Sequence, residues 1–278
     1  DYQRRGTFLS IKVSNLHFNY GQHPILKDIS FIAEDGELLS VLGPNGVGKS
    51  TLFRCILRLL NGYQGKIQIN DVETNDLSIE EMAKLVAYIP QSHYPAFSYS
   101  VFDMVLMGTS VQVSNISSPG NKQIQLVEEA LERLEISHLK NRGYSQISGG
   151  ERQLVLMARA LVQKSKILIL DEPTANLDFG NQIRVLTQIK SLASDGYAVI
   201  QSTHNPDQTF LFSDKVIAMQ DGKIIGCGAP KDIYTETLIQ DLYKIDSKIQ
   251  SLYDDKVRVC IPKSTIIKGH DYKIFSCL

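Results

Sequence analysis

The sequence predicts a mixed α/β protein, and three observations indicate this class. Residues 167–170 and 198–200 are short apolar runs, as in strands that are buried on both faces. Residues 182–192, between these runs, have helical spacing, as expected of a parallel sheet with covering helices. A glycine-rich segment, 43–51, joins the strand-like run 38–42 to a segment with helical spacing.

The remaining elements follow in order along the chain. Residues 8–20 alternate apolar and polar side chains, and 25–42 continue as strand-like runs broken at 34–36. A helix is predicted from Leu52 until 61–62, and a strand is predicted at 66–70. Helical patterns dominate from 91 to 164, and the residues after Pro230 have helical and then strand-like character.

Composition limits the classes of function. The 278 residues are 43% hydrophobic with a net charge of −1, so a large core is possible and nucleic acid is not an expected partner. Four widely spaced cysteines without a C-x-x-C pair indicate neither a zinc site nor disulfides, as in a reduced cytosolic chain. No run approaches the ~20 apolar residues that span a bilayer, and the first residues lack the apolar core of a signal peptide. At a membrane, another chain would do the spanning.

The segment 43–51 has the pattern G-x-x-x-x-G-K-[ST] of a phosphate-binding loop. Glycines let successive N–H groups converge on one anion, and the helix that follows adds its positive N-terminal end. Lys49 would reach the β- and γ-phosphates and Ser50 would ligate Mg²⁺. A glycine turn that merely caps a helix is the alternative. The nucleotide-binding residues predicted here are Gly43, Pro44, Asn45, Gly46, Gly48, Lys49, Ser50 and Thr51.

Two adjacent carboxylates, Asp171 and Glu172, follow the apolar run 167–170. The carboxyl end of a strand is where open α/β sheets bind their ligands. Asp171 can serve Mg²⁺, while Glu172 can orient and activate the attacking water. In isolation such a pair would be read as an ordinary turn.

A second glycine-led helix start lies at 147–153, with the sequence ISGGERQ. It offers another anion-binding N-terminus. One nucleotide needs only one phosphate loop, so this segment either caps an ordinary helix or serves the nucleotide of another subunit.

Together these segments resemble the ATP-binding subunit of an ABC transporter, over residues 9–229. Segment 43–51 looks like its Walker A motif and 167–172 like its Walker B motif. Segment 147–153 looks like its LSGGQ signature, with Ile147 for the first Leu and Glu151 for Gln. The signature residues carried over, which act in trans, are Ser148, Gly149, Gly150 and Glu151.

Single residues complete the resemblance. Gln91 lies where the family has its Q-loop glutamine, His204 where it has its switch histidine, and Asp178 in a segment like its D-loop. Tyr20 lies where an aromatic ring stacks on adenine. Without the resemblance, Gln91 would carry no signal, His204 would be read as a solvated histidine, and Tyr20 could equally be a core aromatic.

The resemblance implies a fold and a domain organisation. The fold would be a P-loop NTPase (RecA-like) core with an N-terminal antiparallel β-subdomain and an inserted helical subdomain. Within one ABC ATPase domain, 1–278, the core with its β-subdomain would comprise 7–90 and 165–230. The helical subdomain with the signature would be 91–164, and 231–278 would be a C-terminal extension.

The resemblance also implies an activity. Two copies would bind head to tail and hydrolyse ATP with Mg²⁺, each lending its signature to the other's nucleotide. Catalysis would depend on Glu172, His204 and Gln91, and the Mg²⁺ ligands would be Ser50, Gln91 and Asp171.

Segments 97–108 and 151–160 look most like importers of iron-siderophore, haem, cobalamin and related metal chelates or oxyanions. Such a subunit would be peripheral at the cytoplasmic face of the membrane, with separate polytopic permease subunits and an extracytoplasmic solute-binding protein. Phe97, Tyr99 and Phe102 would be permease contacts or local core. The alternatives are a soluble ABC-type ATPase in assembly, for example of iron–sulfur clusters, and a nucleotide sensor without turnover.

Overall fold

The computed structural model describes residues 10–91, 98–112 and 120–263. Its central element is a six-stranded sheet in the order β10-β9-β3-β8-β7-β6, in which only β10 is antiparallel to its neighbour. These strands are β3 (Leu38–Leu42), β6 (Val86–Ile89), β7 (Ile167–Leu170), β8 (Ala198–Thr203), β9 (Lys215–Gln220) and β10 (Lys223–Gly228). The predicted α/β class is confirmed.

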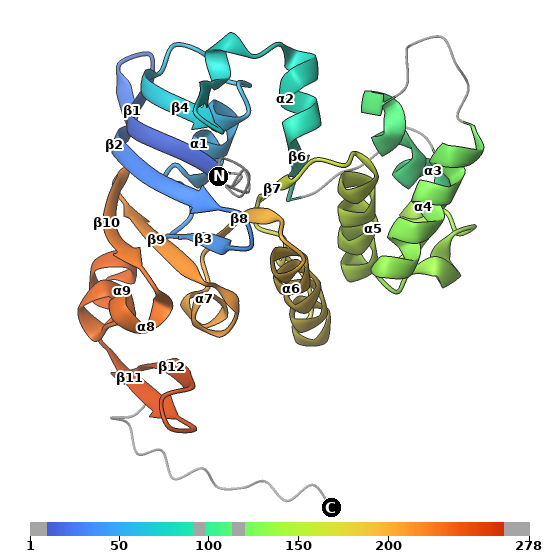
Figure 1. Ribbon diagram of the computed structural model, residues 1–278. Helices are drawn as coiled ribbons and strands as arrows, with labels where there is room; N and C mark the ends of the chain where they lie inside the picture. The colour runs from blue at the N-terminus through green and yellow to red at the C-terminus, as the bar shows by residue number, and fades with distance from the viewer. Residues whose placement is uncertain (1–9, 92–97, 113–119, 264–278) are drawn as a thin grey trace, which may run out of the picture.

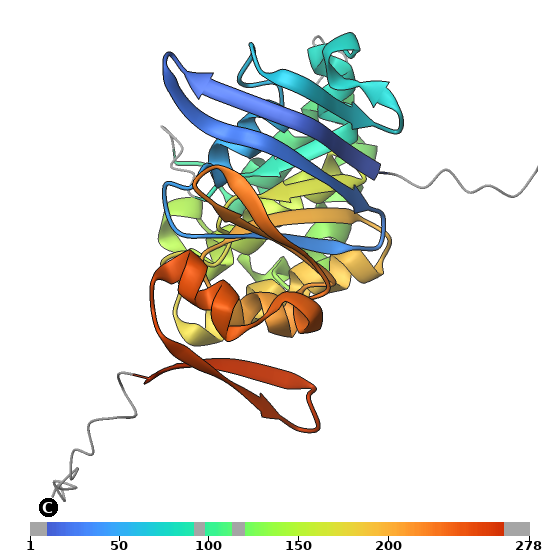
Figure 2. The same ribbon diagram turned by 90° about the vertical axis from the view of Figure 1, so that its left-hand side faces the viewer.

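Two further sheets are antiparallel. A four-stranded sheet has the order β2-β1-β4-β5, and a separate hairpin pairs β11 with β12. Figure 2 shows the four-stranded sheet and the hairpin at opposite ends of the molecule. Their strands are β1 (Ser10–Tyr20), β2 (His23–Glu34), β4 (Gln64–Ile69), β5 (Val72–Glu73), β11 (Ser247–Leu252) and β12 (Val257–Pro262).

Helices cover both faces of the central sheet (Figure 1). The α-helices are α1 (Lys49–Ile56), α2 (Ile79–Leu85), α3 (Val101–Leu106), α4 (Asn121–Arg133), α5 (Gly149–Val162), α6 (Phe179–Ser194), α7 (Pro206–Phe212), α8 (Pro230–Ile233) and α9 (Glu236–Tyr243). Short 3₁₀ turns are η1 (Thr74–Asp76), η2 (Met107–Gln112), η3 (Ser137–Leu139) and η4 (Tyr144–Gln146).

Alternation along β7 divides the main core into two clusters. Ile167 and Ile169 face the antiparallel sheet and α1, whereas Leu168 and Leu170 face α3, α4, α5 and α6. Because every residue of β7 is buried, the strand reads as a continuous apolar run, as the sequence predicts. The two clusters hold the antiparallel sheet and the helical lobe against opposite faces of one sheet.

The helix after the phosphate loop is shorter than the sequence predicts. Helix α1 ends at Ile56, five residues before Asn61, because Arg58 adopts a left-handed conformation with φ 55°. The guanidinium of Arg58 donates to the carbonyl of Leu77, and this contact holds the chain out of the helix. The helical spacing of apolar residues in the sequence extends beyond Ile56, and for this reason it predicts too long a helix.

The residues after Pro230 form helices and then a hairpin, as the sequence predicts. Helix α9 packs Leu238 and Leu242 against Leu42, Val216 and Ala218 of the central sheet. The described part of the extension is thus attached to the same strand, β3, that precedes the phosphate loop. Across the described ranges, no helix combines the length and apolarity that crossing a membrane requires.

We expect Phe53→Ala to destabilise the protein by about 3–5 kcal/mol, because this fully buried ring joins α1 to the antiparallel sheet. Urea unfolding followed by circular dichroism measures the change. Leu59→Ala, at a side chain that is 64% exposed, should change stability by no more than about 0.5 kcal/mol. Equal losses in the two variants would contradict this account of the core.

Candidate nucleotide-binding site

The loop between β3 and α1 needs glycine at two positions for different reasons. A Cβ at Gly43 would lie 2.6 Å from the carbonyl oxygen of Met219, so only glycine permits this approach. Gly48 has φ 111°, which other residues rarely adopt, and it is the N-cap of α1. No side chain caps this helix start, so its first N–H groups face the loop as donors for an anion.

Lys49 opens α1 with its side chain turned into the loop. Its Nζ donates to the carbonyl oxygens of Gly43 at 2.7 Å and Pro44 at 3.1 Å, and lies 3.2 Å from Oε1 of Glu172. Burial lowers the pKa of Lys49, and the charge of Glu172 acts in the opposite direction. The lysine charge is thus held among three oxygens beside the exposed start of α1.

The carboxylates at the end of β7 point to different partners. Glu172 has a left-handed backbone, φ 45°, and its carboxylate lies between Lys49 and Nδ1 of His204, which is 3.3 Å from Oε2. Asp171 is 7% exposed and directs Oδ2 toward the hydroxyl of Tyr88 at 3.4 Å. Burial, followed by the charge of Asp171, raises the pKa of Tyr88 to about 12, so its hydroxyl remains protonated. The structure therefore separates two carboxylates that are adjacent in sequence.

Ser202 joins these two carboxylate residues, and sequence reasoning did not identify it. Its hydroxyl donates to Oδ1 of Asp171 at 2.7 Å and accepts from the N–H of Glu172 at 2.8 Å. Ser202 is fully buried in β8, where the run 201–203 is polar although the strand is buried throughout. Buried polar groups are normally hydrogen-bonded. The polar run 201–203 at the end of an apolar strand is therefore the sequence signal that could have indicated Ser202.

Two cavities border these side chains. One, of about 310 Å³, is lined by loop residues 45, 46 and 48–51 together with Ile25, Gln91 and Glu172. The other, of about 240 Å³, extends from Glu172 toward His204 and α7. Asn45, Gln91 and Glu172 line both, so the structure brings the predicted loop, the carboxylate, Gln91 and His204 together.

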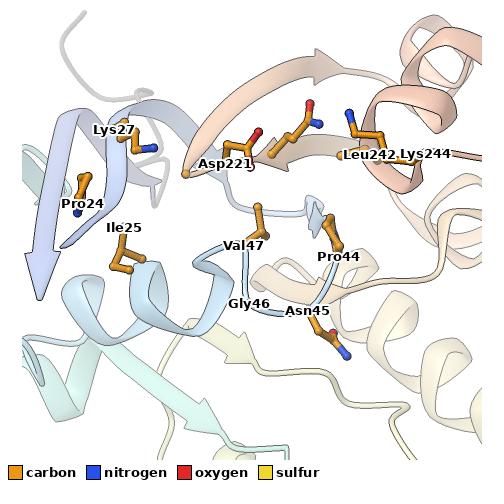
Figure 3. A pocket seen from close by; sticks show the side chains of 12 residues that line it. Pro24, Ile25, Lys27, Pro44, Asn45, Gly46, Val47, Asp221, Leu242 and Lys244 are labelled. Atoms are coloured by element: carbon orange, nitrogen blue, oxygen red, sulfur yellow. The ribbon is translucent and has the colours of Figure 1, made fainter.

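A larger cavity, of about 420 Å³, also borders the phosphate loop (Figure 3). Its walls come from β2, residues 44–47, the β9–β10 turn and the end of α9. Ile25, Asn45 and Gly46 line both this cavity and the 310 Å³ cavity, so the two are contiguous. Leu242 and Lys244 of the C-terminal extension therefore face the phosphate loop across this cavity.

Tyr20 lies at the end of β1, where its ring meets Phe18 edge-on at 4.9 Å and is 43% exposed. In the part of the chain that the structure describes, Tyr20 is not among the residues that line these three cavities. Its interpretation as an adenine-stacking residue remains a prediction.

The second glycine-led helix start is separate from these cavities. Ser148 caps α5 in a reciprocal capping box, in which its hydroxyl accepts from the N–H of Glu151 and its own N–H donates to that carboxylate. The N–H of Ser148 also holds the pKa of Glu151 below its usual value. In the described part of the chain, residues 148–151 do not line the cavities around Lys49.

Asp178 lies beside this helix start. It caps α6, accepting from the N–H and the side-chain amide of Asn181. A Cβ at Gly150 would lie 2.5 Å from Asn181, so glycine lets α5 approach this cap. The signature-like segment and the D-loop-like segment therefore form one surface.

Two of the three predicted permease contacts, Tyr99 and Phe102, lie in the described part of the chain. Tyr99 and Phe102 pack against the core of the helical lobe, and the Lys140 ammonium lies 5.1 Å from the centre of the Phe102 ring. Both side chains are half-buried, so they contribute to the local core, and a permease contact through their exposed parts remains a prediction. Phe97 lies outside the described residues.

The residues present fit Mg²⁺ bound together with a nucleotide. Within the described ranges, no group of three or more His, Cys, Asp or Glu side chains could hold a metal ion. Mg²⁺ commonly takes one or two protein oxygens and completes its shell with phosphates and water. Ser50, which is exposed beside the loop, and the buried Asp171 are oxygen donors of this kind.

The fold and this site define the chain as a nucleoside-triphosphate-binding α/β protein. Residues 26–175 match the sequence model of the family described as ABC transporter. The chain belongs to this family of ATP-binding domains, which are ATPases.

Relatives extend the similarity beyond the family match. A "Probable iron chelatin transport ATP-binding protein" of Helicobacter pylori is 36% identical, over 90% of this chain and 98% of its own. The "Hemin import ATP-binding protein HmuV" of Pseudoalteromonas translucida is 32% identical, over 86% and 94%. A solved ABC transporter described as metal-chelate type, in an inward-facing conformation, has a TM-score of 0.82 at 31% identity, covering 92% of this chain and 99% of its own.

We expect Ser202→Ala to lower stability by about 1–3 kcal/mol, because it leaves the N–H of Glu172 and Oδ1 of Asp171 without their buried partner. Urea unfolding measures the loss. Ser194→Ala removes an exposed hydroxyl that donates to the carbonyl of Lys190 and is the matched control. If both variants unfold at the wild-type urea concentration, the bridge contributes no stability.

Proposed function

We propose that the chain is the ATP-hydrolysing subunit of an importer that takes up a metal chelate through a separate permease. The observation that carries the proposal is the position of Glu172 between Lys49 and His204, at the carboxyl end of a buried strand. The names of the iron chelatin, hemin and metal-chelate relatives support the import of a chelated metal.

Each side chain has a role in this proposal. The N–H groups of the loop and Lys49 bind the β- and γ-phosphates. Glu172 orients the attacking water and accepts its proton, and His204 contacts the γ-phosphate from the opposite side of the carboxylate. Tyr20 would stack on adenine.

Ser50, Asp171 and Gln91 would hold Mg²⁺, which would neutralise charge developing on the phosphates. The hydroxyl of Ser202 donates to Oδ1 of Asp171 and fixes the orientation of this carboxylate. Gln91 lines both cavities and would link the metal to the permease-facing surface.

A head-to-tail dimer would complete the site. The start of α5 lies away from its own chain's phosphate cavities, and Ser148 and Gly149 are exposed. A helix N-terminus stabilises negative charge, so this start could bind the γ-phosphate held by a second copy. Asp178, next to it, would meet the partner's phosphate loop. ATP binding would close the dimer and hydrolysis would open it.

The partners follow from the same proposal. Permease subunits would anchor the chain peripherally at the cytoplasmic face of the membrane, and an extracytoplasmic protein would deliver the chelate.

We expect Glu172→Gln to lower kcat for ATP hydrolysis by about 100-fold or more, because the amide cannot accept the proton of water. ATP binding should persist, and light scattering should detect an ATP-dependent dimer. Glu80→Gln, at an exposed position on α2, is the matched control and should have wild-type kcat. Normal turnover by Glu172→Gln would remove this residue from its proposed role.

The dimer can be tested in the Glu172→Gln background. Adding Ser148→Arg places a long cation at the start of α5 and should abolish the ATP-dependent dimer while each chain still binds ATP. Ser145→Arg, also exposed and three residues earlier, should leave dimerisation intact. A persistent dimer with Ser148→Arg would contradict the head-to-tail arrangement.

Transport is tested by affinity purification of the chain from detergent-solubilised membranes of its source. We expect a polytopic permease to co-purify, and iron-chelate uptake by reconstituted vesicles to require ATP. Exclusive recovery with soluble scaffold proteins would instead support an assembly ATPase and reject the importer.

A further inference from the structure

The C-terminal extension packs against α7, the helix that follows His204. Strand β12 packs along α7, and α8 contacts the same helix. Figure 1 shows α8 and α9 beside α7, with the β11–β12 hairpin beyond them. The extension is therefore packed onto the segment that carries the proposed γ-phosphate contact.

Three hydrogen bonds connect the extension to the start of α7. The hydroxyl of Tyr243 donates to the main-chain carbonyl of His204 at 2.8 Å. Oδ1 of Asp207 accepts from the hydroxyl of Tyr234 at 2.5 Å and from the N–H of Cys260 at 3.0 Å. All three bonds end on His204 or on the first turn of the helix that follows it.

Ring contacts reinforce this attachment. Phe210 of α7 lies 5.6 Å from the ring of Tyr234, and the guanidinium of Arg258 lies 5.6 Å from the centre of the Phe210 ring. Arg258 is itself held by both carboxylate oxygens of Asp255 and by the carbonyl of Lys231. The hairpin is thus fixed to α7 by a side chain that has little freedom.

Hydrogen bonds of the neighbouring residues restrain the main chain on both sides of His204. On its C-terminal side, Asn205 caps α7 by accepting from the N–H groups of Asp207 and Gln208, and its own N–H donates to the hydroxyl of Thr203. The side chain of His204 is 51% exposed, with Glu172 as its carboxylate neighbour. The direction of this imidazole therefore depends on how the main chain is held between β8 and α7.

We propose that Tyr243 is a positioning residue for His204, and that the C-terminal extension thereby sets the rate of ATP hydrolysis. The proposal rests on the γ-phosphate role assigned to His204 above. Tyr243 does not line either of the described cavities that border Glu172. Its ring packs against the cluster around Leu42 and Val216, and its hydroxyl reaches the His204 carbonyl. Burial raises the pKa of Tyr243, so the hydroxyl is a donor at neutral pH.

The test compares tyrosine-to-phenylalanine variants of the full-length chain. Tyr243→Phe removes only the hydroxyl that reaches His204, while Tyr253→Phe removes one from a side chain that is 77% exposed in the same extension. We expect Tyr243→Phe to lower kcat for Mg-ATP about 3- to 10-fold with KM within about 2-fold, because a net hydrogen bond is worth a factor of this size. Tyr253→Phe should match the wild type in both constants.

A spectroscopic readout separates positioning from general damage. In protein labelled on histidine, the imidazole signal of His204, identified by its loss in His204→Ala, should shift in Tyr243→Phe and not in Tyr253→Phe. This measurement does not depend on hydrolysis. Adding Tyr243→Phe to His204→Ala should cause no further loss of kcat, since the hydroxyl acts only through the histidine.

The outcomes distinguish the two proposals. Wild-type kcat in Tyr243→Phe, or an unshifted His204 signal, overturns the positioning role while the function proposed above stands. Wild-type hydrolysis by His204→Ala instead overturns the role of His204 itself. A loss of kcat in Tyr243→Phe that persists in full on top of His204→Ala shows that the tyrosine acts elsewhere, and this also overturns the inference.

Discussion

The parallel pairing of β3, β8 and β7 is the constraint on which the site depends. Leu42 pairs with Thr203, and Leu170 pairs with Gln201, so the three strands end at the same edge of the sheet. The N–H of Gly43 continues the ladder by donating to the carbonyl of Thr203. The phosphate loop, the two carboxylates and His204 are therefore neighbours because their strands end in register, although Lys49 is 123 residues from Glu172 and 155 residues from His204 along the chain.

At this edge of the sheet, buried polar groups orient the carboxylates of Asp171 and Glu172. Ser202 holds Oδ1 of Asp171 and the backbone of Glu172, and Lys49 holds the Glu172 carboxylate from the loop side. A buried charge destabilises a protein unless it is paired. These contacts pair the Glu172 carboxylate and hold its backbone N–H, and so offset the cost of the left-handed conformation at Glu172. The same side chains thus stabilise the turn and orient it toward the nucleotide loop.

Much of this arrangement could be predicted from the sequence, because strand ends and glycine-rich turns are local signals. The apolar runs before Gly43 and Asp171 identify two strands, and the α/β class follows from their alternation with helices. The end of α1 was misplaced because Arg58 leaves the helix through a contact with Leu77, nineteen residues away. Ser202 and Tyr243 were missed for a similar reason: each acts through partners that lie about 30 or 40 residues away along the chain.

The close approach of Gly43 to Met219 has a mechanical consequence. Since the main chain enters the loop wedged against a strand of the central sheet, the entry point cannot shift without displacing β9. Lys49, at the other end, is anchored by its bonds back to residues 43 and 44. We therefore expect any adjustment to an arriving nucleotide to occur in the short exposed segment of Asn45 and Gly46, which lies between these two anchored ends.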